Sequence, residues 1–235
     1  MLKVACGPFS RLEEALAARI GEHPPGTCLA VVTPSRKLAD RLERMLCLER
    51  GRALLNVRFH TFYSLALEVI EAAGPLAGAM VSDGLFHDKL IDALLPKRSS
   101  RGLSGAYRAT VRDLVDAGVE PGSFRENFPD LIKEVPDQAR LERLFSIQEK
   151  YLGAVERAGV LSSPALARLA TAAVQENRAA CLGRFEELYY YGFYDLTGTQ
   201  ADFFSAVAEA FPVRAFVPYR AGHPAFVFAK RLYDL

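Results

Sequence analysis

The chain of 235 residues lacks the patterns that mark several common classes of protein. Its four cysteines stand at positions 6, 28, 47 and 181, with no Cys-x-x-Cys pair and no histidine at ligand spacing, which argues against a zinc site. The formal net charge is only +1, so no overall charge attracts the chain to nucleic acid or to a membrane. Any basic surface must therefore be local.

Long apolar runs are also missing. No stretch approaches 18 apolar residues, so no membrane association is expected. The N-terminus shows no cationic region followed by a long apolar run, so no signal peptide is indicated and we expect a cytoplasmic protein. Cys6 and Cys28 lie in apolar, strand-like runs, where we expect buried reduced thiols.

Catalytic patterns are absent as well. The four histidines are scattered along the sequence in no recognisable catalytic pattern, and no Ser–His–Asp set, paired carboxylates or nuclease-type Asp…Glu-x-Lys hairpin is present. No G-x-G-x-x-G follows the first predicted strand, which disfavours a dinucleotide-binding enzyme. We therefore predict no catalytic residue, no metal and no cofactor in this sequence.

The most informative absence is at the start of the chain, where a strand runs into Gly7 and Pro8. An NTPase would place its phosphate loop, G-x-x-x-x-G-K-[ST], at this point. Counting from Gly7, the second glycine falls on Leu12, the lysine on Glu13 and the hydroxyl residue on Glu14. Two carboxylates would repel a triphosphate, so Gly7, Pro8 and Glu13 are interpreted as a degenerate phosphate loop.

What is present is an alternation of strands and helices in the first third of the chain and again near its end. This order predicts an α/β fold with a parallel sheet and right-handed crossovers. The expected strands cover residues 3–6, 28–32, 54–59, 187–193 and 213–218. The expected helices cover residues 10–20, a segment opened by Thr33-Pro34-Ser35, a segment opened by Thr61 or Ser64, and residues 201–210. Thr197 and Gln200 predict a capping box before the last of these.

The middle of the chain has helical periodicity and almost no strand signal. Helices are predicted over residues 86–95, 105–117, 137–158 and 163–175, punctuated by prolines. We therefore predict an all-helical insertion over residues 79–179, within an α/β core formed by residues 1–78 and 180–235. A helix is expected over Ala225–Leu235, and we expect the sequence to be part of a longer protein.

Two segments place hydroxyl residues where a strand ends and a helix begins. The first is Thr33-Pro34-Ser35-Arg36-Lys37-Leu38-Ala39. Ligands gather at the carboxyl ends of parallel strands, and helix N-termini there present free N–H groups to anions. Thr33, Ser35, Arg36 and Lys37 are therefore candidate phosphate contacts. The alternative interpretation is plain helix capping with solvated cations.

The second segment is Thr61-Phe62-Tyr63-Ser64-Leu65-Ala66-Leu67. Thr61 again stands at the end of a strand, and Phe62 and Tyr63 are candidates to stack on the bases of a single strand. The alternative is a helix cap followed by core aromatic residues.

Together these two segments resemble the single-strand-contacting motifs of the UvrD/Rep-like superfamily 1 helicases, roughly "TPSR-x-LA-x-x-L" and "TFHSLAL". Tyr63 replaces the histidine of the second motif. The order, the spacing and the helical insertion that follows are similar to domain 1A with its inserted domain 1B. The resemblance implies a P-loop-NTPase-like (RecA-like) core and DNA-binding roles for Thr33, Ser35, Arg36, Lys37, Thr61, Phe62 and Tyr63.

A third segment, residues 187–200, ends its strand in Gly192-Phe193 where an active helicase has the Asp-Glu pair that binds Mg²⁺. Its form, "Y-G-F-x-D-L-T-x-x-Q", resembles the B subunit of the bacterial AddAB helicase–nuclease and related RecB-like proteins. In that subunit a helicase-like domain without motor function precedes a PD-(D/E)xK nuclease. We interpret Asp195 as a residue that caps or precedes the next helix.

The resemblance implies an inactive helicase-like domain of a DNA repair and recombination complex, with single-stranded DNA and a helicase subunit as partners. The acidic "DF-x-x-L" motif of active helicases is also missing, since residues 161–166 read Leu-Ser-Ser-Pro-Ala-Leu. Two alternatives stay open: a pure assembly module without DNA contact, and a residual ATPase. A local cationic excess favours DNA. It comprises Arg36, Lys37, Arg41, Arg44, Arg50, Arg52 and Arg58, against Asp40, Glu43 and Glu49.

Overall fold

A computed structural model of the chain describes residues 2–51, 53–74, 80–81, 84–95, 101–220 and 222–230. The chain divides into two compact units. Unit 1 consists of residues 1–75 and 166–235, and unit 2 consists of residues 76–165. Unit 1 is therefore built from both ends of the chain. The contact boundary at residue 165 lies before the boundary predicted at residue 179.

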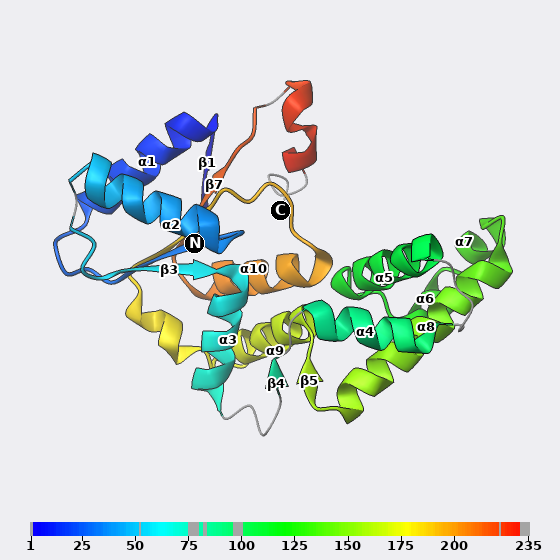
Figure 1. The fold of residues 1–235 in the computed structure, drawn as a ribbon. Coiled ribbons are helices and arrows are strands. Elements are labelled where there is room, and N and C mark those ends of the chain that lie inside the picture. Colours follow the sequence, from blue (N-terminus) through cyan, green and yellow to red (C-terminus); the bar gives the residue numbers. More distant parts are fainter. Residues whose placement is uncertain are drawn as a thin grey trace. The chain divides into compact units, whose positions relative to one another are not determined.

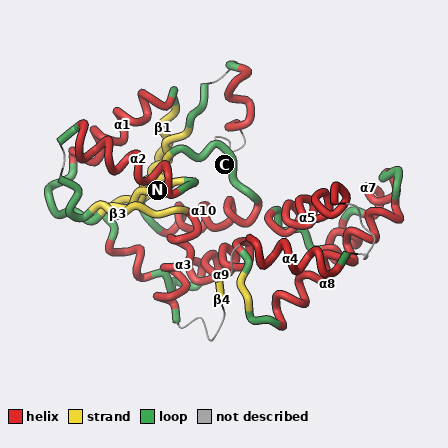
Figure 2. The backbone as a smooth tube through the Cα atoms, in the orientation of Figure 1, coloured by secondary structure: helices red, strands yellow, loops and turns green. Residues whose placement is uncertain are grey.

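Unit 1 contains a parallel five-stranded sheet, so the protein has a mixed α/β fold (Figures 1 and 2). The strand order across the sheet is β1-β7-β6-β2-β3. The strands are β1 (Leu2–Cys6), β2 (Leu29–Thr33), β3 (Val57–Thr61), β6 (Glu187–Tyr191) and β7 (Val213–Val217). Every residue of β2 and β6 is buried, as expected for central strands of a parallel sheet that is covered on both faces.

Helices α1 (Phe9–Glu22) and α2 (Arg36–Arg44) cover one face of this sheet (Figure 1). A π-helical segment, η1 (Met45–Glu49), continues α2. Their apolar sides pack with alternate residues of the strands, because side chains along a strand point to opposite faces in turn. The core on this face comprises Leu12, Leu16, Ala17, Ile20, Leu29, Val31, Leu42, Met45, Leu46, Tyr189, Tyr191 and Phe216.

Helices α3 (Phe62–Ala73) and α10 (Gly198–Ala210) cover the other face (Figure 1). Tyr190, which points away from the first core, makes an edge contact with Phe204, with 4.8 Å between the ring centroids. Phe62 makes a similar contact with Phe203 at 5.2 Å. Aromatic side chains thus form much of this second core. The predicted capping box of Thr197 and Gln200 opens α10 and is confirmed.

In unit 1, the five predicted strands and the predicted helices up to α10 all form, but the third strand was misplaced. It covers Val57–Thr61 instead of residues 54–59, so Thr61 is its last residue. The prediction of buried thiols was also wrong. Cys6 is exposed because β1 is an edge strand, and Cys28 is half-buried and precedes β2.

Unit 2 is built mainly from helices around one apolar core, which includes Ile91, Val111, Ile147, Tyr151 and Val160. Its helices are α4 (Gly84–Leu94), α5 (Arg101–Asp116), α6 (Pro121–Asn127), α7 (Pro129–Glu134) and α8 (Gln138–Arg157). It also holds a short parallel pair, β4 (Met80–Val81) with β5 (Val160–Leu161). The prediction of an all-helical insertion was therefore wrong in this detail.

Helices α6 and α7 were missed because Pro121 and Pro129 were interpreted as breaks. Both prolines occupy the first helical position, where the missing N–H would have no partner in any case. Three further elements complete the described fold: α9 (Ser163–Gln175), η2 (Ala180–Arg184) and η3 (Pro224–Ala229). The helix expected over Ala225–Leu235 is a 3₁₀ helix as far as Ala229 and α-helical at Lys230, and residues 231–235 lie outside the described part.

Candidate functional site

The candidate site is the carboxyl edge of the sheet in unit 1. The strand register sets Thr61, Thr33, Tyr191, Phe216 and Ala5 side by side across the five strands. The turns that follow these residues consequently leave the sheet at one level. In open α/β sheets this edge is where ligands bind, especially where neighbouring strands lead to helices on opposite faces. Here β2 leads to α2 and its neighbour β6 leads to α10 on the other face.

The turn after β1 contains only Gly7 and Pro8 before α1 begins at Phe9. The residues that stand in the phosphate-loop positions are therefore helical. Leu12 is buried in the core, and Glu13 forms an ion pair with Arg41 of α2. A phosphate loop needs several backbone N–H groups that face a ligand, whereas N–H groups within a helix bond to its own carbonyls.

The turn after β2 is held by Thr33, which is completely buried. Its hydroxyl oxygen lies 3.0 Å from the carbonyl oxygen of Ser35 and 3.4 Å from that of His60. Thr33 therefore stabilises the turn and is not a direct contact, which corrects the prediction for this residue. Ser35 is exposed and caps α2, accepting a hydrogen bond of 3.3 Å from the Leu38 N–H.

Arg36 and Lys37 follow in the first turn of α2, and both side chains are exposed. Arg36 is held by Asp40, with 2.8 Å between the guanidinium nitrogen and the carboxylate oxygen. Within the described residues, Lys37 has no ion pair. Of these two predicted contacts, Lys37 is thus the one whose charge is not already compensated.

At the end of β3, Thr61 and Ser64 form a capping box for α3. The Thr61 N–H donates to the Ser64 hydroxyl at 2.9 Å, and the Ser64 N–H donates to the Thr61 hydroxyl at 3.1 Å. Phe62 is buried between Phe193 and Phe203, so its predicted role as a stacking platform was wrong. Tyr63 is half-buried, and burial raises the pKa of its hydroxyl.

The turn after β6 depends on Gly192, whose backbone lies in the left-handed region with φ of 79°. A Cβ at this position would lie 2.8 Å from Cδ2 of Leu38 and 3.9 Å from Cδ of Pro34. Glycine therefore allows the turns after β6 and β2 to pack closely. This contact lies where β2 and β6 lead to helices on opposite faces of the sheet.

The cationic stretch from Arg36 to Arg58 does not form one surface. Alternation along β3, in register with β2, puts Arg58 on the face opposite to α2. Arg50 follows η1, at the end of α2 and η1 that is remote from the carboxyl edge. Arg41 is paired with Glu13, and Arg52 lies outside the described residues.

Three exposed residues at this edge were missed by sequence reasoning. They are Arg11 in the first turn of α1, Tyr194 after β6 and Arg220 after β7. Tyr194 is 51% exposed. Their positions just after predicted strand ends were a usable signal, but none belongs to a recognisable motif.

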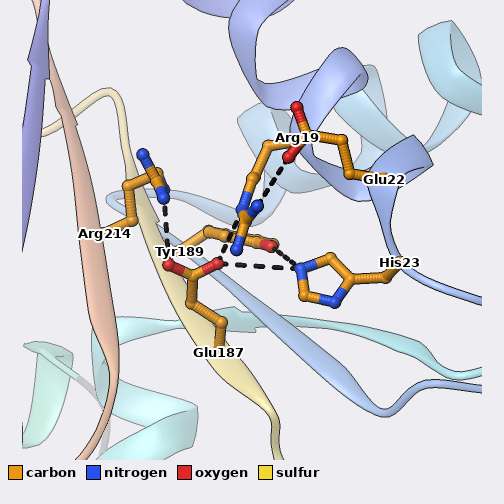
Figure 3. Close-up of polar contacts among 6 residues, drawn as sticks. All are labelled: Arg19, Glu22, His23, Glu187, Tyr189 and Arg214. Atoms are coloured by element: carbon orange, nitrogen blue, oxygen red, sulfur yellow. Dashed lines mark hydrogen bonds and ion pairs between the residues drawn. The ribbon is translucent and has the colours of Figure 1, made fainter.

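The opposite, amino edge of the sheet carries a buried ion cluster around Glu187, the first residue of β6 (Figure 3). The Glu187 carboxylate accepts hydrogen bonds from Arg19 at 2.9 Å and from Arg214 at 3.3 Å. His23 Nε2 lies 3.7 Å from the same carboxylate and 2.8 Å from the Tyr189 hydroxyl. Four side chains thus surround one buried carboxylate.

Charge and burial act in opposite directions in this cluster. Desolvation alone would raise the pKa of Glu187, but hydrogen bonds and the charges of Arg19 and Arg214 hold this pKa below its usual value. Burial and the neighbouring carboxylate raise the pKa of the Tyr189 hydroxyl well above its usual value. Glu187 is therefore ionised and Tyr189 neutral at pH 7.

Among the described residues, no cluster of His, Cys, Asp or Glu could hold a metal ion. No helix in the described part of the chain is long and apolar enough to cross a membrane. Comparison with known proteins gives no match for this chain, either to a protein family or to a curated protein.

Proposed function

We propose that this chain is the helicase-like part of a DNA repair helicase–nuclease, in which unit 1 is a RecA-like core without motor chemistry. It would guide single-stranded DNA and serve as a scaffold for a helicase partner subunit. The motif resemblance at residues 33–39, 61–67 and 187–200 is the origin of this proposal. The parallel sheet, covered by helices on both faces and formed from both ends of the chain, supports it.

The observation that carries the loss of motor chemistry is the short turn after β1. Only Gly7 and Pro8 separate β1 from α1, and the position of the phosphate-binding lysine is Glu13, which pairs with Arg41. At the end of β6, Gly192 packs against Leu38 where an active helicase has acidic metal ligands. Both features disfavour binding of a magnesium nucleotide.

The support for DNA binding is the chemistry of the carboxyl edge. Ser35 and Lys37 are exposed at the start of α2, and Tyr63 is partly exposed at the start of α3. A hydroxyl, an ammonium group and an aromatic ring are the groups that hold a phosphate backbone and a base of a single strand.

A second candidate, an assembly module without DNA contact, is favoured by a different observation. In unit 2, Phe128 and Leu131 are 48% and 52% exposed, at α6 and α7. Exposed large apolar residues that lie close together are typical of surfaces that bind other proteins. This candidate predicts no affinity for oligonucleotides.

The test is a fluorescence anisotropy titration of the chain with a labelled oligothymidylate at low salt. Binding tighter than about millimolar supports DNA guidance, whereas weaker binding favours the assembly module. A thermal melt with and without magnesium ATP tests the third possibility, a residual ATPase. A ligand present at a hundred times its Kd stabilises a protein by about 2.7 kcal/mol, so an unchanged melting temperature is expected here.

A further inference from the structure

The carboxyl edge continues beyond the two helicase-like motifs to the turns after β7 and β1. These two turns are joined directly, because the Gly7 N–H donates to the Val217 carbonyl. Arg220 follows Val217 by three residues, and a Cβ on Gly7 would lie 3.8 Å from the Cβ of Arg11. Arg11 therefore stands beside the turn in which a phosphate loop is missing, and Arg220 belongs to the turn that is hydrogen-bonded to it.

Both arginines are exposed, and neither has an ion pair within the described residues. Tyr194, half exposed, lies between them and Lys37 in the order of the strands. Across the edge, the sequence of groups is Arg11 after β1, Arg220 after β7, Tyr194 after β6, Lys37 after β2 and Tyr63 after β3. Cations and aromatic rings thus follow one another in strand order along this edge, with Arg11 and Lys37 in helices of one face and Tyr63 in a helix of the other.

This order is the pattern that holds a single strand without sequence preference, since cations track the phosphates and aromatic rings stack on the bases. Five strands have four spacings of about 4.8 Å, so the line is about 19 Å long. That length exceeds what one phosphate needs and suits an extended segment of several nucleotides.

We propose that single-stranded DNA crosses the whole carboxyl edge of unit 1, from the turn after β3 to the turn after β1. The place where a motor would hold its triphosphate then forms the far end of the DNA path, with Arg11 and Arg220 as phosphate contacts. This inference rests on the proposed function, and it extends the DNA path beyond the residues implied by the resemblance. Asp195, exposed beside Tyr194, would be the unfavourable charge along this path.

The test measures the salt dependence of oligothymidylate binding for the unaltered chain and for matched variants. Each phosphate contact on a single strand contributes about 0.7 to the log–log slope. The double variant Arg11→Ala/Arg220→Ala should lower the slope by about 1.4, and Arg11→Lys/Arg220→Lys should restore it. Arg50→Ala removes an equally exposed cation remote from this edge and should leave the slope unchanged.

Two further variants test the middle of the path. Tyr194→Ala should weaken binding about tenfold, while Tyr194→Phe keeps the ring and should bind as the unaltered chain does. Asp195→Asn removes the unfavourable charge and should strengthen binding about twofold at low salt. Far-ultraviolet circular dichroism and melting temperature establish that each variant is folded.

The outcomes separate this inference from the proposed function. If the unaltered chain binds and Lys37→Ala flattens the slope, but the double arginine variant behaves as Arg50→Ala does, the DNA stays near β2 and β3 and the inference is wrong. If the unaltered chain does not bind any oligonucleotide, the proposed function fails and the inference fails with it.

Discussion

The two edges of the sheet in unit 1 differ in the burial and pairing of the charged side chains described below. At the amino edge, Glu187 is only 5% exposed, and its carboxylate is surrounded by Arg19, Arg214 and His23 (Figure 3). At the carboxyl edge, Lys37 and Arg220 are exposed without an ion pair within the described residues. The charges around Glu187 are thus compensated within the protein, whereas those of Lys37 and Arg220 face the solvent.

This difference indicates which edge stabilises the fold and which is available for a ligand. A buried ion cluster costs desolvation energy, and removal of one partner leaves the others without compensation. Exposed cations contribute little to stability, because water and salt screen them. Substitutions at the amino edge should therefore change stability, whereas substitutions of the cations at the carboxyl edge should change only binding.

The largest effect is expected for Glu187→Gln. It leaves Arg19 and Arg214 beside a neutral amide and should lower the free energy of unfolding by about 3 kcal/mol, measured by urea denaturation. The control is Glu22→Gln, which removes the other, largely exposed carboxylate partner of Arg19. It should cost less than about 1 kcal/mol. Equal losses of unfolding free energy in the two variants would contradict the idea that the buried cluster stabilises the fold more than an exposed ion pair does.

The pH dependence of stability tests the same carboxylate. The pKa of Glu187 is lowered in the folded state, so its contribution is fully present above the pKa of an unfolded glutamate, about 4.3, and is lost as pH falls through the folded pKa. The difference in unfolding free energy between the unaltered chain and Glu187→Gln should consequently be constant near neutral pH and narrow in acid. If this difference in unfolding free energy instead widens in acid, the ionised form of Glu187 destabilises the fold.

An intermediate effect is expected for Gly192→Ala at the carboxyl edge. The new Cβ meets Leu38 at 2.8 Å, and φ is 79°, so the variant should lose about 1 to 2 kcal/mol of stability. Gly7→Ala is the matched control, since its nearest contact would be at 3.8 Å and its φ is ordinary. Adding Leu38→Ala to Gly192→Ala relieves the clash but not the backbone strain. Because Leu38 packs against the core, a double-mutant cycle that includes Leu38→Ala alone separates these two costs.

The smallest effect is expected for single cations of α2. Lys37→Ala should lower the log–log salt slope of oligonucleotide binding by about 0.7 without a change in melting temperature. Arg36→Ala should lower it less, because Arg36 is already held by Asp40. If Arg36→Ala lowers the salt slope more than Lys37→Ala does, DNA displaces Asp40 from its ion pair with Arg36.

The elements of unit 1 were largely predictable, because buried parallel strands are continuous apolar runs and Thr197 and Gln200 carry a clear capping signal. The predicted roles of Thr33 and Phe62 were wrong for one reason. A hydroxyl or a ring after a strand is compatible with either a ligand or the core, and only the neighbouring elements decide between them. Helices α6 and α7 were missed because proline occurs both after the end of helices and at their first position, and the sequence alone does not distinguish these two cases.

The sequence by itself determined the alternation of strands and helices and the acidic residues in the phosphate-loop positions, since both depend on the order of residue types along the chain. Only the tertiary structure decided that Thr33 and Phe62 are buried and that Arg58 lies on the face opposite to α2. It alone brought Glu187 together with Arg19 and Arg214, and joined the turn before Arg11 to the turn that carries Arg220. The physical reason is that strand order and register bring together residues that are distant in the sequence, and no local pattern records which ones meet.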